Sequence, residues 1–309
     1  MTEAHQADDQ QAAIRRVADT VAPSVVRIGR HGGRGCGVVV ADGLVVTNAH
    51  NLRDRTTLVT FADGRAVQGR ATGIDVDGDL SVLAVDTGGV PALSWADSPA
   101  DLGLPVYAVA TLPGGRRVTA GRVSAVDRSF RGPRGRLVTG GIEHTAPLAR
   151  GSSGGPVVDA TGRLVGITTL RLGDGFAIAQ PAGEELRARV DALAEGREPA
   201  RVVLGVGVAP AHVARRLRAA VGLDERPGAL VRGVSDGSPA QAAGIARGDL
   251  ITAIGDDAVD DPAGLEAALA HRQPGDTVAV SIVRGTTDLT LTVTFPAPDA
   301  PEDAPSDAP

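Results

Sequence analysis

The sequence contains no lysine, a single cysteine and few aromatic residues. All 31 basic residues are arginine and the net charge is −6, so no general basic field is present to attract nucleic acid. With Cys36 alone, no intramolecular disulfide can form and no cysteine-based zinc motif exists. Aromatic residues make up only 2% of the 309 residues, so the cores must be built from Val, Leu, Ile and Ala. We therefore predict no nucleic-acid partner, no metal and no cofactor.

Long apolar runs are also missing. No stretch approaches the roughly 18 apolar residues that a membrane-spanning helix needs. Residues 1–11 are polar and acidic, and they lack both the basic start and the apolar middle of a secretory signal. As written, the chain is expected to be soluble and its compartment is unknown. An export segment that has been truncated or removed stays an open alternative.

The chain length and the changes in pattern along it predict two domains. From residue 24 to about 179, short apolar runs alternate with turns rich in Gly, Asp and Pro, which is typical of an all-β barrel or sandwich. Apolar residues at helical spacing predict a helix that carries Ile14, Val17 and Val21, and a second helix over 184–195. The expected organisation is a disordered tail over 1–11, a first domain over 12–195, a linker over 196–201, a second domain over 202–295, and a disordered acidic Pro/Ala tail over 296–309.

The second domain reads as α+β, with strands mixed with two helices. Ser238 is placed to cap the first helix and Pro239 to open it, and Gly244 is its expected stop. The pair Asp261-Pro262 opens the other helix in the same way.

The strongest chemical signal is the segment GSSGGP at residues 151–156. A serine hydroxyl is a poor nucleophile and needs a base together with hydrogen-bond donors for the oxyanion. Glycines allow backbone N–H groups to converge on one point without interference from Cβ atoms. An ordinary Gly-Ser loop between strands is the alternative for this segment taken alone.

Two further segments occur before it in an order that fits catalysis. A hydrophobic strand ends in TNAH, which delivers His50, and Asp79 stands directly before the apolar run at residues 80–85. A buried aspartate needs a partner, and an imidazole N–H is a suitable one. The Asp75-Asp77-Asp79 run also raises calcium as an alternative. It fails the EF-hand template, because Gly78 is at the fourth position and Asp86 is at the twelfth.

Together the three segments resemble the motifs of the bacterial HtrA/DegP group of trypsin-like serine proteases. The resemblance implies two six-stranded Greek-key β-barrels of the chymotrypsin type. It also implies His50 as general base, Asp79 as its orienting carboxylate and Ser153 as nucleophile, in the His, Asp, Ser order of that class. Ser153, and not Ser152, matches the serine before the two glycines. The N–H groups of Gly151 and Ser153 would form the oxyanion hole.

The sequence departs from the family pattern at three positions. Ser152 replaces the usual Asn, which leaves the backbone role intact, and Arg150 stands where the family often has Pro. Cys36 lies where Ser or Thr is common. We interpret Cys36 as a small buried residue, with a reactive thiol as the alternative.

Substrate preference is weakly marked in the sequence. The primary pocket of trypsin-like enzymes is lined partly by the segment six residues before the nucleophile, which is Pro147 here with Leu148 beside it. The run GFAIA at residues 175–179 resembles another wall of that pocket and contributes Ile178. No Asp occupies the place that favours Arg or Lys, so we predict cleavage after small or medium aliphatic residues.

Residues 202–295 resemble a PDZ domain of the permuted type found in HtrA proteases. The matching pieces are VLGV at 203–206, GALV at 228–231, GSPAQAAG at 237–244 and RGDLI at 247–251. Such domains bind a peptide by adding it to a sheet edge. The resemblance places the carboxylate-binding amides at Leu204, Gly205 and Val206, with Leu265 and Leu269 on the helix that walls the groove. A plain core role is the alternative for the two helix residues.

These observations predict a serine endopeptidase that acts on misfolded or regulatory proteins through an acyl-enzyme. Its PDZ domain would bind peptide C-termini to target or regulate it. The alternative is an inactive protease fold that serves as a PDZ scaffold or chaperone-like binding protein. The resemblance also implies a homotrimer and a place outside the cytoplasm, although no aromatic residue precedes Phe61 to form the family's usual N-terminal trimer contact.

Overall fold

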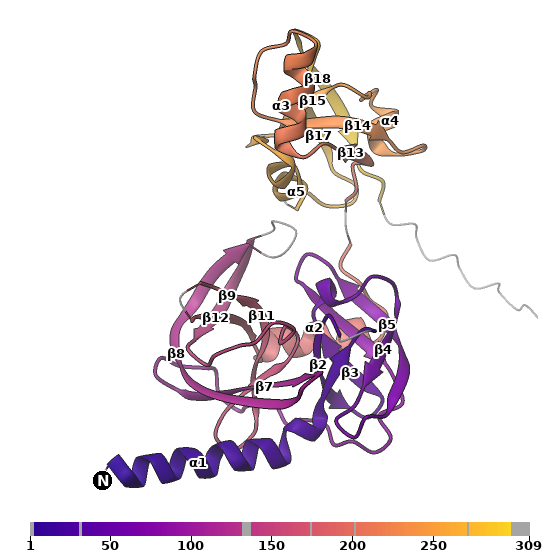
Figure 1. The fold of residues 1–309 in the computed structure, drawn as a ribbon. Helices are drawn as coiled ribbons and strands as arrows, with labels where there is room; N and C mark the ends of the chain where they lie inside the picture. Colours follow the sequence, from indigo (N-terminus) through magenta and orange to yellow (C-terminus); the bar gives the residue numbers. More distant parts are fainter. Residues whose placement is uncertain are drawn as a thin grey trace, which may run out of the picture. The chain divides into compact units, whose positions relative to one another are not determined.

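The computed structural model describes residues 3–30, 33–131, 137–173, 175–200, 202–270 and 272–297 (Figure 1). These residues divide into two compact units, with the boundary between Glu198 and Pro199. That boundary falls inside the linker that the sequence predicts.

The first unit contains two closed β-barrels of six strands each. The first barrel has the strand order β1-β2-β3-β6-β5-β4. Its strands are β1 (Val25–Ile28), β2 (Gly35–Ala41), β3 (Leu44–Thr47), β4 (Thr56–Thr60), β5 (Ala66–Asp75) and β6 (Leu80–Ala84). The valine-rich runs build its core, because β-branched side chains pack well on a pleated surface.

The second barrel has the strand order β10-β11-β12-β9-β8-β7. Its strands are β7 (Pro105–Leu112), β8 (Gly115–Arg131), β9 (Leu137–His144), β10 (Pro156–Val158), β11 (Leu164–Arg171) and β12 (Ala177–Pro181). The predicted pair of six-stranded barrels is confirmed. The His50 segment follows the end of β3, and the Ser153 loop leads into the start of β10. The barrel strands therefore fix the positions of both segments.

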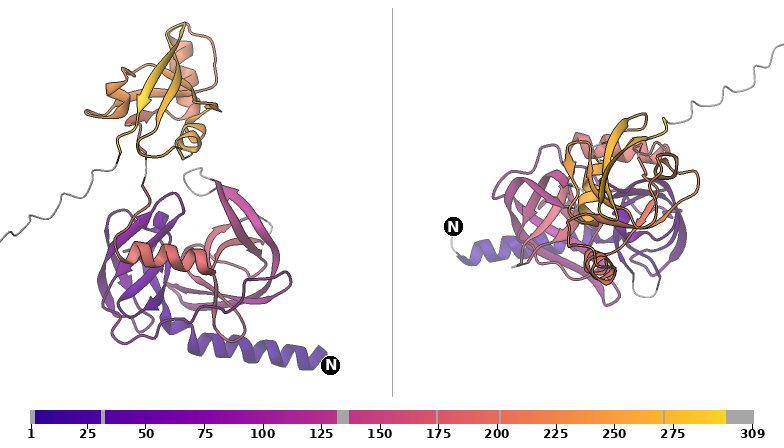
Figure 2. Two further views of the ribbon diagram at one scale, coloured as in Figure 1. Left: turned by 180° about the vertical axis from the view of Figure 1, so that it is seen from behind. Right: turned by 90° about the horizontal axis from the view of Figure 1, so that it is seen from above.

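Two longer helices belong to the first unit. Helix α2 (Glu184–Ala194) confirms the predicted helical spacing, since Leu186, Val190 and Leu193 are all buried. It packs on β5 and β6 and crosses the back of the first barrel (Figure 2). No helix in the described ranges is both long and apolar enough to cross a membrane.

Helix α1 (Glu3–Thr20) corrects one expectation. Residues 3–11 were predicted to form a disordered tail, but the structure includes them in this helix, which the short η1 turn (Ala22–Ser24) follows. The reason is that the segment is rich in Ala, Glu and Gln, which are good helix formers, and has no Gly or Pro. Val17, near the helix end, and Val21, directly after it, are buried and anchor it.

The second unit is a five-stranded antiparallel sheet with helices and one extra short strand. The sheet has the order β13-β14-β15-β17-β18, and β16 pairs with β15. Its elements are β13 (Val206–Val208), α3 (Ala211–Ala220), β14 (Ala229–Val234), α4 (Pro239–Ala242), β15 (Leu250–Ile254), β16 (Asp257–Ala258), α5 (Pro262–Ala270), β17 (Thr277–Arg284) and β18 (Thr287–Thr294). The α+β character is confirmed, and β13 forms an edge of the sheet.

The helix starts of this unit are as predicted. Ser238 caps α4, and its hydroxyl accepts a hydrogen bond from the Gln241 N–H at 3.2 Å. Helix α3 is a third helix that the sequence analysis missed. It buries only Ala214 and Arg218, so its apolar periodicity is too short to stand out. Residues 298–309 of the predicted tail lie outside the described residues.

Candidate active site

The histidine and the aspartate predicted for the triad meet where two paired strands end. Strands β3 and β6 are hydrogen-bonded neighbours, with Thr47 opposite Ser81. His50 lies on the short helix η2 (Ala49–Asn51) just after β3, and Asp79 lies just before β6. The antiparallel pairing therefore brings a residue after one strand next to a residue before the other.

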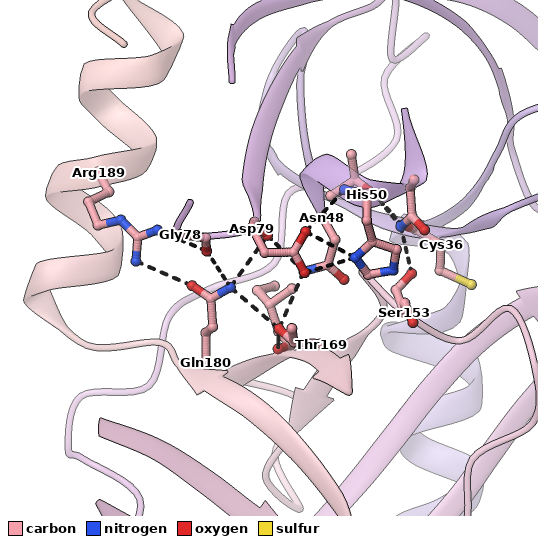
Figure 3. A network of polar contacts seen from close by, with 12 residues as sticks. Cys36, Asn48, His50, Gly78, Asp79, Ser153, Thr169, Gln180 and Arg189 are labelled. Carbon is pink, nitrogen blue, oxygen red and sulfur yellow. Dashed lines mark hydrogen bonds and ion pairs between the residues drawn. The ribbon is translucent and has the colours of Figure 1, made fainter. Parts of the chain in front are cut away.

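Their contacts form a tight pair (Figure 3). The His50 Nδ1 lies 2.9 Å from Asp79 Oδ1 and 2.8 Å from Oδ2, and the His50 backbone N–H also donates to Oδ1 at 3.0 Å. The Asp79 side chain is 2% exposed, whereas that of His50 is 29% exposed. Since a carboxylate only accepts, the neutral imidazole carries its proton on Nδ1 and keeps a lone pair on Nε2. Within the described ranges, Nε2 has no hydrogen-bond partner, so it is free to take a proton from a nucleophile.

Ser153 is held in place through its backbone carbonyl. That oxygen accepts hydrogen bonds from the Cys36 N–H at 2.7 Å and from the Asn51 side-chain amide at 2.9 Å. The next residue, Gly154, has φ +85° and donates its N–H to Thr168 at 2.7 Å. Ser153 and His50 line the same pocket, and Figure 3 shows the serine beside the imidazole.

The backbone N–H groups that were predicted to form the oxyanion hole make no hydrogen bond within the described residues. Gly151 has φ +86°, a conformation that favours glycine. In the part of the chain that the structure describes, the N–H groups of Gly151 and Ser153 donate to no acceptor. Backbone donors at such a loop are worth most when nothing else occupies them, because the oxyanion then meets preorganised dipoles.

Cys36 lies behind this loop and is fully buried. Its thiol approaches the carbonyl oxygens of Gly151 at 3.2 Å and Thr111 at 3.5 Å. Burial raises the pKa of the Cys36 thiol to about 11, although the hydrogen bond to Thr111 acts in the opposite direction. A thiol that stays protonated at neutral pH is a poor nucleophile, which favours the interpretation of Cys36 as a small buried residue.

The pocket around Ser153 has a volume of about 360 Å³. Leu148 lines it, as predicted from the sequence, together with Thr168 and Thr169, which the sequence analysis did not single out. Their position in the sequence could have indicated them, because they directly follow the run LVGI at residues 164–167 of β11. Pro147 lines a neighbouring cavity of about 510 Å³ with Phe176 and Ala177.

Ile178 does not line either of these two cavities. It is only 1% exposed, whereas its neighbour Ala177 lines the larger cavity. Successive side chains of a strand face opposite sides, so only one residue of this pair can face the cavity. The predicted wall is therefore made by Ala177, and the assignment of Ile178 to the pocket surface is wrong for these cavities.

The segment predicted to bind peptides in the second unit lies beside an edge of the sheet. Leu204 and Gly205 precede the edge strand β13, and among the described residues their N–H groups donate to no acceptor. Gly205 has φ +81°, and a Cβ there would overlap the Ser238 side chain. Gly205 also lines a cavity of about 330 Å³ with Val203 and the turn at residues 235–239.

The helix residues predicted for the groove wall lie in the domain core. Leu265 is 3% exposed and packs in the core cluster of the second unit, and Leu269 is half-buried against the same cluster. The structure therefore gives Leu265 the core role that the sequence analysis kept as its alternative. A groove role for Leu269 stays a prediction.

Known proteins share both units. Residues 35–167 match the family described as Trypsin-like peptidase domain, and residues 202–295 match the PDZ domain family. The chain is 34% identical over 287 residues to the "Probable periplasmic serine endoprotease DegP-like" of Rhizobium meliloti (strain 1021), which covers 87% of this chain and 54% of that protein. It thus spans about half the length of the curated relatives it matches.

Solved structures give the same result. The serine endoprotease from Yersinia pestis matches with a TM-score of 0.55 and 25% identity, covering 93% of this chain and 98% of that chain. The HtrA-type protease AlgW with tripeptide matches with a TM-score of 0.54 and 28% identity, covering 93% and 99%. Fold and site define a trypsin-like peptidase domain that is followed by one PDZ domain. The chain belongs to the HtrA/DegP family of serine endoproteases.

Proposed function

We propose that this chain is an active serine endopeptidase with His50, Asp79 and Ser153 as its triad. The observation that supports this most directly is the buried Asp79 paired with His50 Nδ1, while Nε2 is free in the pocket that Ser153 lines. A scaffold protein would have no need for an aspartate that is 2% exposed and aimed at a partly exposed histidine.

The proposed mechanism follows from these positions. His50 Nε2 accepts the proton of the Ser153 hydroxyl as its oxygen attacks a peptide carbonyl, and Asp79 stabilises the imidazolium that forms. The Gly151 and Ser153 N–H groups donate to the oxyanion. The imidazolium then gives its proton to the leaving amine, and the acyl-enzyme forms. A water molecule, deprotonated by His50, hydrolyses this ester and restores the serine.

A fluorophosphonate probe tests the proposal. We expect the intact protein to form one covalent adduct, and peptide mass spectrometry to locate it on Ser153 and not on Ser152. Ser153→Ala should abolish labelling, whereas Ser129→Ala, which removes an exposed serine on β8, should leave it unchanged. If the protein stays unlabelled with and without added C-terminal peptides, the scaffold alternative is the better account.

The second unit is proposed to bind peptide C-termini. A peptide strand would add to the free edge of β13, and its carboxylate would meet the N–H groups of Leu204 and Gly205 and, as the resemblance implies, that of Val206. Misfolded or regulatory proteins are the proposed substrates. The relatives are named as probable periplasmic proteases, and an extracytoplasmic location of this chain is part of the proposal. The homotrimer stays a prediction from the resemblance.

The substrate pocket predicts a preference for aliphatic residues before the cleaved bond. The lining residues include Leu148, Arg150 and Arg171 but no Asp or Glu, so a cationic side chain would meet positive charge without a partner. We expect kcat/KM for peptides with Val, Ala or Leu at this position to exceed that for Arg by about 10-fold or more. A peptide series varied at this one position measures the ratio, and a clear preference for Arg would contradict the prediction.

A further inference from the structure

We infer that Arg189 of α2 and Gln180 of β12 are positioning residues for the catalytic aspartate. They hold the turn at residues 75–79, the Asp79 turn, through its backbone carbonyls, and Asp79 in turn orients His50. This inference rests on the proposed function, because it says how the proposed triad is kept in place. Neither residue touches His50 or Ser153 by a hydrogen bond in the described structure.

The Asp79 turn needs support from outside itself. Asp79 has φ +50°, a left-handed conformation that costs about 1 kcal/mol or more for a residue with a side chain. Inside the turn, the Gly78 N–H donates to Asp75 Oδ1 at 2.7 Å. A residue in this sparsely populated conformation persists where surrounding contacts hold it, so the groups that contact the turn from outside contribute to its shape.

Three amide and guanidinium groups surround the carbonyl oxygens of this turn (Figure 3). The Gln180 Nε2 donates to the Gly78 oxygen at 2.9 Å and lies 3.4 Å from the Asp79 oxygen. The Arg189 Nη2 donates to the Gly78 oxygen at 3.1 Å and to Asp75 Oδ2 at 2.8 Å. Asn48 donates to the Asp79 oxygen at 3.0 Å. The backbone carbonyl oxygens of Gly78 and Asp79 therefore accept hydrogen bonds from side chains of the first barrel, the second barrel and helix α2.

Arg189 also favours the orientation in which the Gln180 amide donates to the turn. Its Nη1 donates to Gln180 Oε1 at 3.2 Å. A guanidinium has donors only, so the amide must turn its oxygen to Arg189 and its NH2 group to the carbonyls of Gly78 and Asp79. Gln180 is 3% exposed, so water cannot easily replace this partner. Without Arg189 the buried Gln180 Oε1 loses its donor and the Gly78 oxygen loses one of its two side-chain donors, which weakens the hold on the turn.

The segment that leads to the second unit also contacts the residue that precedes the Asp79 turn. Glu198, the last residue of the first unit, accepts a hydrogen bond from the Ile74 N–H at 3.0 Å and pairs with Arg55. Ile74 directly precedes the Asp79 turn. Arg189 and Glu198, which both follow the last barrel strand, thus contact residues 74–79, so the chain after that strand contributes to the geometry of the proposed triad.

The test compares Arg189→Met with Arg187→Met in the full chain. Arg187 lies on the same helix, but its guanidinium is placed over the Trp95 ring and makes no hydrogen bond to the Asp79 turn in the described residues. For Arg189→Met we expect kcat for peptide cleavage to fall about 10- to 100-fold while KM stays within about threefold. Arg187→Met should keep both constants.

A second readout separates positioning from stability. The His50 Nδ1 proton, bonded to Asp79, should give a far-downfield proton NMR resonance in the wild-type chain. We expect Arg189→Met to shift or broaden it and Arg187→Met to preserve it. Gln180→Glu supplies a nearly isosteric second variant, since a carboxylate still pairs with Arg189 but cannot donate to the Gly78 and Asp79 oxygens. It should reproduce both effects in a folded chain.

The outcomes separate this inference from the proposed function. If Arg189→Met and Gln180→Glu both leave the resonance and kcat unchanged, the positioning role is overturned. If they lower the unfolding midpoint but not the resonance or kcat, the network is structural and the positioning role is again overturned. A chain that never cleaves peptides refutes the proposed function, yet a resonance that depends on Arg189 and not on Arg187 would still support the positioning of Asp79.

Discussion

Ser153→Ala is expected to lower kcat for peptide cleavage about 10⁶-fold, and Asp79→Asn about 10⁴-fold. The two losses differ because the residues do different work. Removing the serine removes the group that forms the acyl-enzyme. Asparagine at position 79 can still accept the hydrogen bond from the His50 backbone N–H, but it no longer selects the tautomer with the proton on Nδ1. Residual turnover then comes from the oxyanion donors and substrate binding alone.

The ordering of these two effects is the informative result. Absorbance and circular dichroism should first establish the concentration and folding of each variant, and kcat is then measured with an aliphatic peptide substrate. The exposed Ser129→Ala serves as the control and should retain full activity. If Asp79→Asn cost less than about 10-fold, the short contacts between Asp79 and His50 would have a structural role, and the assignment of the triad would have to be revised.

The sequence was enough to single out the three groups of the proposed triad because each sits in a short local pattern. An apolar run leads to His50, another begins after Asp79, and a glycine-rich loop surrounds Ser153. Each of these residues can therefore be recognised from its neighbours in the sequence. The groups that orient them were not predictable in this way. Gln180 and Arg189 lie about a hundred residues from Asp79, and their role depends on which atom of an amide faces a backbone carbonyl. No local pattern in the sequence carries that information.

The same limit explains the error at the pocket wall. Counting back from the serine led to Pro147, which lines the neighbouring cavity, and the adjacent Leu148 lines the pocket of Ser153. Ile178 was assigned from the motif alone. Its side of β12 depends on how that strand pairs with β11, where the register shifts between Thr168 and Leu170. A one-residue change of register exchanges the two faces of a strand, so the motif could not decide between Ala177 and Ile178.

Gly154→Ala is the substitution with the largest expected effect on stability. A Cβ at this position would overlap the Cys36 carbonyl oxygen and lie 2.7 Å from Thr47 Oγ1, and the residue has φ +85°. Left-handed backbone costs about 1–2 kcal/mol, and displacing packed neighbours adds a cost of about 1–3 kcal/mol. We therefore expect a loss of about 3 kcal/mol in the free energy of unfolding, measured by urea titration of Trp95 fluorescence, which reports on the first unit.

Gly64→Ala is a matched control that separates the two costs. Gly64 also has a left-handed backbone, with φ +90°, but no atom lies within 4 Å of a Cβ placed there. It should therefore lose only the conformational part, about 1 kcal/mol, and keep its activity. Equal losses for the two variants would show that the Gly154 site relaxes around a methyl group. The predicted difference would instead show that Gly154 is required because Cys36 and Thr47 pack directly against the backbone next to Ser153. The loop that carries Ser153 then could not change its path without displacing strands of the first barrel.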